Sequence, residues 1–568
     1  MIKFNTRSFV RYVHVYQAKK LSKGVIESAA THDLLQWLGF VKQTQSGLVH
    51  WLPMGLRTLN KITHVIKYRM NTYGRAHEVS LSTLSPRALW LRTGRWGNSE
   101  LFKLKDSKGA EYCLAPTCEE EITSLIGAYV SSYKDLPLLA YQVTRKYRDE
   151  RRPRGGLLRG REFLMKDGYS FDVTKESAIE TFNRMNKCYD LIFQDLRVPF
   201  VSAWADSGDI GGDMSKEYHY LHETGEDVLM KCTSCESVSN VETCNSYPVK
   251  EGEHGGDVDV RYALNKERDT LLCLYYPKGR TLNWNHVKGI MDDDIDLALR
   301  ETSNDKILEI FSEKYPEDEA MFASVIRVMD CRLNSHSNFP DFPLKQYLKS
   351  NFAQLTGESL VDAVHQEICG ECKEGSLEAA KSIEVGHTFY LGTKYSERLD
   401  GKFMTKDNNE QLMEMGCYGI GVSRLVGAIA QVTRDEKGLR WPKSSAPYEI
   451  SLCAAQFDSK VEEARDLLSS HADELWIDAR DKVSLGRKIS QSHCLGIPLC
   501  VIVGNKHWPH VEIEVRGRRV SDQWHAKYNQ LAQEYQWTML PASNDAFEKH
   551  RVHKNHLSDV AAILLTDM

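Results

Sequence analysis

A basic hairpin is the feature that most constrains how this chain folds. Two strand-like stretches, residues 139–149 and 162–172, flank a loop that holds Pro153, Gly155 and Gly156. Between residues 145 and 166 there are nine basic and three acidic residues. The pattern predicts two antiparallel strands with a cationic tip, and it favours a site for an anion or a nucleotide. The alternative is a solvated basic surface loop.

Individual side chains of this hairpin suit a nucleotide. Arginine binds phosphate through two parallel hydrogen bonds and stays charged, so Arg148 and the loop arginines fit a triphosphate. Glu150 is predicted on the same strand face as Arg148, where its carboxylate can accept a hydrogen bond from an exocyclic amine. Phe163 offers a face on which a base can stack. The sequence has no P-loop and no HExxH pattern, so neither a Walker-type site nor a zincin protease is indicated.

The composition indicates several ordinary globular domains. The chain has 568 residues, 73 Lys and Arg against 78 Asp and Glu, and a formal net charge of −5. This length suggests about three or four domains. No run of about 18 apolar residues occurs, so we expect no membrane partner. The weakly acidic balance argues against a generally basic protein, although a local basic patch can still bind nucleic acid.

Changes in composition along the chain predict five parts. Residues 1–25 carry six Lys or Arg and no acid, which is typical of a mitochondrial transit peptide; the alternative is a basic N-terminal arm. Residues 245–375 are more polar and are predicted to be an inserted domain between two parts of one core, 26–244 and 376–440. Residues 441–568 alternate strand-like and helical runs, which predicts a small α/β domain.

Local patterns predict single elements. Four apolar residues recur at helical spacing after Pro53, which suits a first helical position; they are Leu59, Ile62, Ile66 and Met70. Residues 77–84 alternate in part as a strand. A Gly-rich strand is predicted to run into an apolar helix around Arg424.

Several segments together make the chain resemble the prolyl-tRNA synthetases of bacterial and organellar type, which are class II aminoacyl-tRNA synthetases. The resemblance covers about residues 40–240 and 380–568. Its most specific segments are APTCEEE (115–121), KYRDERRPRGGLLRGREFLMKDGYSF (146–171), GDIGG (208–212), IEVGHTFYLGTKYS (383–396) and MGCYGIGVSR (415–424).

The resemblance implies a fold, an activity and a set of partners. The fold is an α+β catalytic domain with a class II antiparallel sheet and flanking helices, an inserted domain, and a C-terminal α/β anticodon-binding domain. The activity is ATP- and Mg²⁺-dependent ligation of proline to tRNA(Pro). A homodimer in the mitochondrial matrix is expected. The alternatives are a related protein that activates another amino acid, or one that binds tRNA without ligation.

The resemblance also assigns roles in binding ATP. Arg148 contacts the α-phosphate and the substrate carboxylate, and Glu150 reads the adenine amine. Arg159 contacts the γ-phosphate, and Phe163 stacks on adenine. Arg424 approaches the adenine and the γ-phosphate from the other side, so Arg148 and Arg424 are the candidate catalytic residues.

The resemblance predicts a pocket for proline as well. Thr117 and Glu119 match the loop that binds the prolyl amine; a secondary ammonium has two N–H donors, which one hydroxyl and one carboxylate can satisfy. His387 is a candidate for the wall of this pocket, with a core histidine as the equal alternative. The carboxylate of proline is already a nucleophile at neutral pH, so no general base is required.

The chain departs from the family in two places. Ser82 stands where motif 1 has a proline, so the detailed geometry of the dimer interface is expected to differ. The insertion contains no convincing copy of the site that hydrolyses alanyl-tRNA in many bacterial relatives. We therefore expect a chain that does not edit.

Two cysteine pairs flank the insertion. Fourteen cysteines in a chain of this length are too dilute for a disulfide scaffold. The pairs are Cys232-x-x-Cys235 and Cys369-x-x-Cys372, separated by 133 residues. This spacing within each pair suits a Cys₄ zinc site if the insertion loops out between them. The alternative is a set of reduced structural thiols, with Cys244 as a spare ligand.

Overall fold

A computed structural model describes residues 23–212, 214–249, 256–316, 320–541 and 547–568. The predicted transit peptide, 1–25, lies almost entirely outside the described residues. The chain divides into two compact units. The first comprises Met1–Phe200, Ile210–Asp213 and Val385–Met568, and the second comprises Val201–Asp209 and Met214–Glu384.

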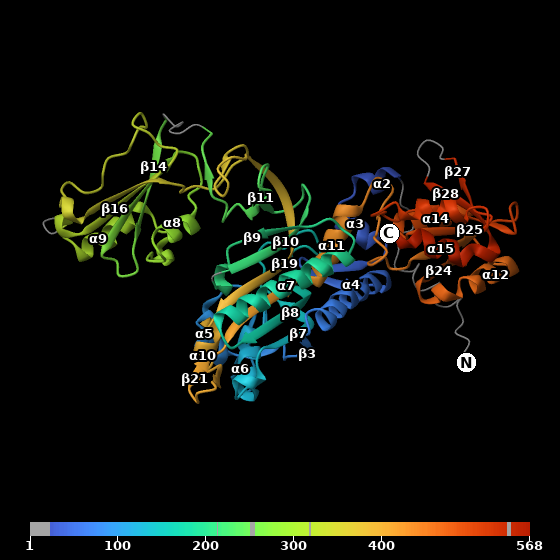
Figure 1. Cartoon of the computed structure of the whole chain (residues 1–568), viewed down its shortest axis with the longest axis horizontal. Coiled ribbons are helices and arrows are strands. Elements are labelled where there is room, and N and C mark those ends of the chain that lie inside the picture. Colours follow the sequence, from blue (N-terminus) through green and yellow to red (C-terminus); the bar gives the residue numbers. More distant parts are fainter. Residues whose placement is uncertain (1–22, 213, 250–255, 317–319, 542–546) are drawn as a thin grey trace. The chain divides into compact units, whose positions relative to one another are not determined.

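An antiparallel sheet forms the centre of the first unit (Figure 1). The predicted hairpin is present as β7 (Leu138–Tyr147) and β8 (Glu162–Asp172), which pair along their whole length. β8 pairs on its other side with β22 (Glu414–Ile420), and β22 pairs with the end of β19 (Leu377–Gly392). At the outer edge, β3 (His77–Glu78) runs parallel to β7.

Three helices pack on this sheet and on one another (Figure 1). They are α4 (Pro53–Thr72), α7 (Lys175–Asp195) and α11 (Val422–Thr433). The predicted helix is confirmed as α4, with Pro53 in its first turn and all four predicted apolar residues buried. The predicted strand-to-helix segment is confirmed as β22 followed by α11, which is buried along most of its length. The prediction for 77–84 is only partly confirmed, because the strand β3 ends at Glu78.

Shorter elements complete this part of the first unit. A three-stranded sheet in the order β4-β6-β5 carries the segment that leads into α6. The elements are α2 (Lys23–Ser28), α3 (Thr31–Trp37), β1 (Val41–Gln45), β2 (Leu48–Trp51), β4 (Leu84–Pro86), α5 (Arg87–Thr93), η1 (Arg95–Gly97), β5 (Lys103–Lys105), β6 (Glu111–Leu114), α6 (Glu119–Tyr129), η2 (Tyr133–Asp135), α10 (Lys394–Arg398), β20 (Lys402–Met404) and β21 (Glu410–Leu412).

The C-terminal part of the first unit is a six-stranded mixed sheet with helices. The strand order is β24-β23-β25-β26-β28-β27, and the apolar faces of the central strands form one buried cluster with α12 and α15. The elements are β23 (Ile450–Ala454), α12 (Ser459–Leu467), β24 (Leu475–Asp478), α13 (Leu485–Leu495), β25 (Leu499–Val503), β26 (His510–Val515), α14 (Gln523–Leu531), β27 (Thr538–Leu540), β28 (Glu548–His553) and α15 (Leu557–Thr566). The predicted α/β character is confirmed.

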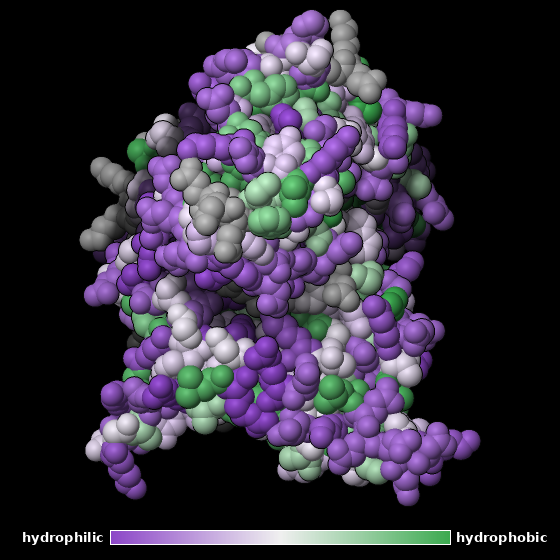
Figure 2. Space-filling model, turned by 90° about the vertical axis from the view of Figure 1, so that its left-hand side faces the viewer, coloured by the Kyte–Doolittle hydropathy of each residue, from purple (hydrophilic) through white to green (hydrophobic). Residues whose placement is uncertain are grey.

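The second unit contains a four-stranded sheet, β14-β15-β16-β17, covered by α8 and α9. The face of the molecule shown in Figure 2 is mainly hydrophilic, with small separate hydrophobic areas. The elements are β9 (Val201–Trp204), β10 (Met214–Leu221), β11 (Asp227–Cys232), β12 (Val238–Asn240), β13 (Ser246–Tyr247), β14 (Val258–Leu264), β15 (Thr270–Pro277), α8 (Trp284–Ile290), α9 (Asn304–Lys314), β16 (Ser324–Asp330), β17 (Phe352–Glu358) and β18 (Ile368–Cys369).

Candidate active site

The nucleotide-site candidates lie at the loop end of the β7–β8 hairpin. β7 ends at Tyr147, and the Arg148 backbone N–H still bonds the Arg161 carbonyl at 2.9 Å. The chain then turns, because the Glu150 N–H bonds back to the Arg148 carbonyl at 2.8 Å. The prediction that Arg148 and Glu150 share a strand face is therefore wrong. Both residues lie in the tight turn that follows the strand.

Arg148 lies beside the predicted stacking residue. Its guanidinium carbon is 5.4 Å from the centre of the Phe163 ring, within the range of a cation–π contact. Phe163 is half-buried on β8, opposite Lys146 in the register of the hairpin. A flat group held near this ring would therefore have a guanidinium next to it.

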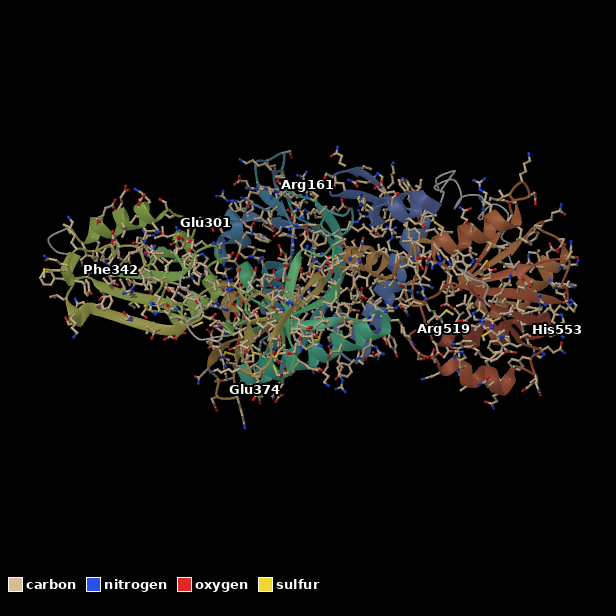
Figure 3. All side chains as sticks on the ribbon, turned by 90° about the horizontal axis from the view of Figure 1, so that it is seen from above. Arg161, Glu301, Phe342, Glu374, Arg519 and His553 are labelled. Atoms are coloured by element: carbon tan, nitrogen blue, oxygen red, sulfur yellow. The ribbon has the colours of Figure 1, made fainter. Side chains whose placement is uncertain are left out.

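Glu150 is held inside the cationic loop. Arg159 Nε donates to Glu150 Oε2 at 2.7 Å, and the Arg152 N–H donates to Oε1 at 3.2 Å. Arg161, labelled in Figure 3, donates from Nε to the Glu150 carbonyl oxygen at 3.1 Å. Burial would raise the pKa of Glu150, but the hydrogen bond from Arg159 holds it below its usual range. Glu150 is thus an ionised acceptor at neutral pH.

Arg424 is joined to the same loop from the side of α11. Its Nε donates to the Leu158 carbonyl at 2.8 Å, one residue before Arg159. The neighbouring Ser423 hydroxyl accepts a 2.8 Å bond from the Leu164 N–H on β8. These two bonds join the start of α11 to the hairpin, so Arg424 lies beside the candidate nucleotide-binding residues of the hairpin loop.

The loop before α6 contains the residues predicted to bind the prolyl amine. Thr117 Oγ1 donates to Glu119 Oε1 at 2.8 Å, and Cys417 Sγ lies 3.1 Å from the same oxygen. Glu119 is fully buried. Burial alone would raise the pKa of Glu119, but the charge of Arg95 and the bonds from Cys417 and Thr117 hold it below its usual range. Glu119 is therefore a buried carboxylate that can receive a cation.

Two contacts place this loop and His387 beside the hairpin. The Tyr147 N–H bonds the Ala115 carbonyl at 3.2 Å, so the loop begins next to the segment that holds Arg148. The His387 ring stacks on Phe389 with ring centres 3.9 Å apart. Phe389 packs in a buried cluster with Cys118, the residue between Thr117 and Glu119. His387 therefore belongs to the sheet face that carries this loop.

The motifs did not point to Arg95, which is the cation closest to Glu119 among the described residues. Arg95 Nη1 lies 3.1 Å from Glu119 Oε2 and 3.1 Å from Glu120 Oε2. The two glutamates follow Arg95 by 24 and 25 positions, a separation that no local pattern marks. Only the packing of η1 on the start of α6 brings them together.

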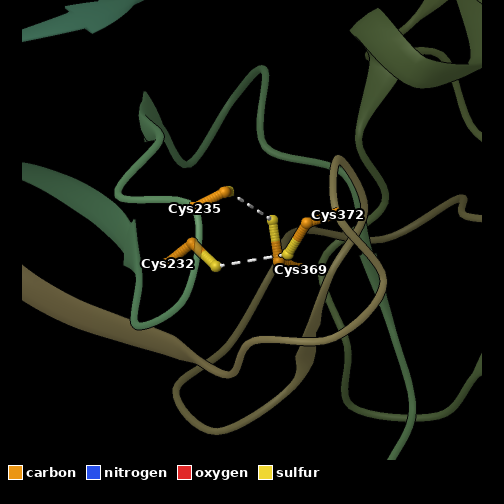
Figure 4. Close-up of side chains that lie close together, drawn as sticks. All are labelled: Cys232, Cys235, Cys369 and Cys372. Carbon is orange, nitrogen blue, oxygen red and sulfur yellow. Dashed lines mark hydrogen bonds between the residues drawn. The ribbon is translucent and has the colours of Figure 1, made fainter.

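The two cysteine pairs meet in the second unit (Figure 4). Cys232 Sγ lies 3.6 Å from Cys372 Sγ, and Cys235 Sγ lies 4.0 Å from Cys369 Sγ. All four sulfurs lie within 4.8 Å of one another. Burial raises the pKa of Cys232 to about 11, whereas hydrogen bonds from backbone N–H groups of Gly375 and Glu374 lower that of Cys372 to about 6. The 133 residues between the two cysteine pairs therefore loop out, as a shared site requires.

Comparison with known proteins identifies the family. A family model described as the tRNA synthetase class II core domain (G, H, P, S and T) matches residues 102–433. A Saccharomyces cerevisiae protein described as a probable mitochondrial proline–tRNA ligase is 53% identical over 581 residues, covering 100% of each chain. The chain belongs to the proline–tRNA ligase family. The family predicted from the motifs is therefore confirmed.

Other family members are more distant in sequence. A cytoplasmic proline–tRNA ligase of Candida albicans is 42% identical over 563 residues, covering 95% of each chain. A Geobacter metallireducens proline–tRNA ligase is 34% identical over 532 residues, covering 86% of this chain and 92% of its own. A crystal structure of Cryptosporidium parvum prolyl-tRNA synthetase with halofuginone and AMPPNP has a TM-score of 0.58 at 14% identity, covering 97% of this chain and 80% of that one. This likeness confirms the predicted fold class.

No helix in the described ranges is long and apolar enough to cross a membrane. The longest helix, α7, illustrates the reason, because it is amphipathic and carries charged residues along its exposed side.

Proposed function

We propose that this chain attaches proline to tRNA(Pro) in mitochondria through a prolyl-adenylate. The observation that carries the proposal is the buried, ionised Glu119 bonded by Thr117, in a loop that begins beside the Arg148 segment. A cation site for the amine and an arginine for the carboxylate are what recognition of a free amino acid requires. Full-length similarity to a protein described as mitochondrial supports the organelle.

Arg148 and Arg424 act on the reacting groups of ATP in this proposal. Arg148 binds the α-phosphate and the proline carboxylate, whose oxygen attacks the α-phosphorus while the bond to pyrophosphate breaks. Arg424 holds the γ-phosphate side, and the ribose hydroxyl of the tRNA then attacks the prolyl carbonyl and releases AMP. Catalysis consists of positioning and charge stabilisation. The family uses ATP with Mg²⁺, which neutralises phosphate oxygens when it is bound.

The remaining contacts to ATP require one rearrangement. Glu150 is assigned to the adenine amine and Arg159 to the γ-phosphate, but in this structure they bind each other at 2.7 Å. Arrival of ATP would replace that ion pair with two contacts to the nucleotide. Phe163 lies half-buried beside Arg148, where it can stack on adenine.

Proline-dependent ATP–pyrophosphate exchange tests this function. We expect exchange with proline and its loss in Arg148→Ala, because no other group is assigned to the α-phosphate. Arg145→Ala is the matched control, since Arg145 is an exposed arginine of the same hairpin that pairs with Glu162. Exchange with another amino acid, or binding of tRNA without exchange, would favour the two alternatives. Intact Thr117 and Glu119 argue against the first alternative. The second is disfavoured by the intact nucleotide-site residues Arg148, Glu150, Phe163 and Arg424.

We further propose that the four cysteines bind one structural zinc ion. Zinc–sulfur bonds of about 2.3 Å in a tetrahedron place the sulfurs about 3.8 Å apart. The separations of 3.6 Å for Cys232–Cys372 and 4.0 Å for Cys235–Cys369 bracket that value and exclude a disulfide in either pair. Backbone N–H groups of Ser234 and Gly375 point at Cys232 Sγ and Cys372 Sγ, both at 3.4 Å, as suits thiolates. The ion would tie together the two ends of the insertion.

Metal analysis of the purified protein tests the zinc proposal. We expect one zinc per chain and its loss in Cys232→Ser and Cys372→Ser. Cys331→Ser is the control, because Cys331 lies in the same unit outside the cluster. Absence of stoichiometric zinc from protein prepared without chelator would contradict the proposal.

Further features of the layout belong to this proposal. Residues 1–25 direct the chain to the matrix, and 245–375 form an insertion in a core of 26–244 and 376–440, followed by an anticodon-binding domain, 441–568. A reporter fused to residues 1–30 that stays in the cytosol would contradict the targeting role. We also propose a homodimer, in which Ser82 alters the interface; a monomeric mass in solution would contradict it.

A further inference from the structure

Three consecutive carboxylates begin helix α6, and Arg95 meets two of them. Glu119 and Glu120 are fully buried, and Arg95 Nη1 reaches each at 3.1 Å. Glu121 is the third. The positive end of the helix stabilises such charges by up to about 2 kcal/mol at a partly buried site, less than the several kcal/mol that burial of an unpaired carboxylate costs. The arginine is therefore the main compensating charge.

The fold holds Arg95 firmly in this place. Its side chain is only 13% exposed, and its guanidinium lies over two aromatic rings, 5.0 Å from Trp90 and 5.7 Å from Tyr395. Gly94 makes the approach possible: it ends α5 with a φ of 79°, a left-handed conformation that favours glycine. The next residue then points back at α6.

We propose that Arg95 is a positioning residue that keeps Glu119 charged and correctly turned to receive the prolyl ammonium. The inference rests on the function proposed above, and it names a residue outside the sequence motifs. Its role is distinct from direct contact with the substrate, since Arg95 acts through Glu119.

The hydrogen bonds around Glu119 show which acceptor positions remain for the ammonium group of the substrate. Each carboxylate oxygen accepts about two bonds. Oε1 receives Thr117 Oγ1 at 2.8 Å and Cys417 Sγ at 3.1 Å, so it is filled. Oε2 receives Arg95 at 3.1 Å and keeps one acceptor position. The Thr117 hydroxyl gives its own hydrogen to Glu119 and lies 3.4 Å from the Tyr169 hydroxyl, which leaves one of its two lone pairs for the substrate.

These two remaining acceptors match a secondary ammonium. One N–H of proline would bond Glu119 Oε2 and the other would bond Thr117 Oγ1. A primary ammonium has three N–H donors, so one would stay buried without a partner from this pair, which is costly. Without Arg95, Glu119 loses its charge or rotates, and the match disappears.

Glu120 also contacts Arg95, and its substitution supplies a control. Thr93 Oγ1 donates to Glu120 Oε1 at 2.8 Å, and Arg95 Nη1 lies 3.1 Å from Glu120 Oε2. Burial raises the pKa of Glu120 despite the charge of Arg95. The other titratable groups that interact with this cluster are Glu121, the hydroxyls of Tyr169 and Tyr395, and the thiols of Cys113, Cys118 and Cys417.

The test compares Michaelis constants in ATP–pyrophosphate exchange. Arg95→Met should raise the KM for proline about 30-fold or more and leave the KM for ATP within about threefold, since one partner of a buried charge pair is removed. Glu119→Gln should have a similar effect, and the double variant should be little worse than either. Glu120→Gln should change the KM for proline by less than about threefold.

A pH profile separates positioning from loss of structure. In Arg95→Met the KM for proline should fall as pH rises, because the uncompensated Glu119 ionises only at higher pH, while Arg95→Lys should restore most of the affinity at neutral pH. Equal changes in both KM values, a flat pH profile, or an unfolded Arg95→Lys variant would overturn the inference. An unchanged Glu119→Gln variant would instead overturn the proposed role of Glu119 itself.

Discussion

Glu150 and Arg159 bind each other at 2.7 Å across the loop of the β7–β8 hairpin. The two residues are assigned to different ends of ATP, so each would exchange this bond for a contact to the nucleotide. Arg159 is also the more exposed partner, with 45% of its side chain accessible against 10% for Glu150. The arginine is therefore the one that can move when ATP arrives.

Arg159→Ala is expected to weaken ATP binding selectively. The substitution removes a charge-assisted contact to the γ-phosphate, which corresponds to a rise of about tenfold or more in the KM for ATP. The KM for proline should change less than about twofold. Arg145→Ala, on the same hairpin, should change neither value. A larger effect on proline than on ATP would contradict the assignment of Arg159.

The buried carboxyl group of Glu121 is expected to make the free energy of unfolding decrease as pH rises. Burial and the neighbouring Glu120 raise the pKa of Glu121 from 4.5 to about 8. Between these values the folded chain holds a proton that the unfolded chain has lost, so the free energy of unfolding decreases with increasing pH in this window.

Glu121→Gln keeps the shape and removes this titration. Urea unfolding should show a difference of less than about 1 kcal/mol from the original chain at pH 5 and a gain of about 4 kcal/mol at pH 8. Glu180→Gln, an exposed position on α7, serves as the control. A Glu121→Gln variant with the original pH dependence would show that Glu121 ionises normally.

Gly55 lies where α4 touches the preceding segment. A Cβ atom there would stand 2.1 Å from the Phe40 carbonyl oxygen, which already accepts a bond from the Leu52 N–H at 2.9 Å. We expect Gly55→Ala to lower the free energy of unfolding by about 1–3 kcal/mol, because this oxygen belongs to the backbone and cannot rotate away. Gly97→Ala, with open space around it, should change it by less than about 0.5 kcal/mol. Thermal or urea unfolding measures both, and equal effects would contradict the prediction.

The chain is expected not to hydrolyse alanyl-tRNA. A pocket that fits proline also admits the smaller alanine, and binding alone separates such pairs poorly. The insertion nonetheless lacks a convincing copy of the bacterial hydrolytic site. Deacylation of alanyl-tRNA by the purified chain should equal the rate without protein, and measurable hydrolysis would contradict this prediction.

Local sequence patterns determined the elements and the family. Helical spacing predicted α4, the Gly-rich run predicted β22 and α11, and the basic hairpin predicted β7 and β8. These patterns succeed because the period of a helix or strand is written in adjacent residues. The motif residues lie within or next to such elements, so their approximate grouping also followed. The end of β7 could not be predicted, because the turn at Glu150 depends on a backbone hydrogen bond that no periodic pattern encodes.

The tertiary structure alone decided which distant side chains meet. Arg95 reaches Glu119 across 24 positions, and Cys232 reaches Cys372 across 140. The cysteine spacing suggested a partnership that only the looped-out insertion could bring about, and nothing in the sequence suggested Arg95. Such contacts form only in the folded chain, where packed elements bring distant side chains together. Their energy depends on burial and on what else is bonded nearby, and neither can be obtained from the order of residues.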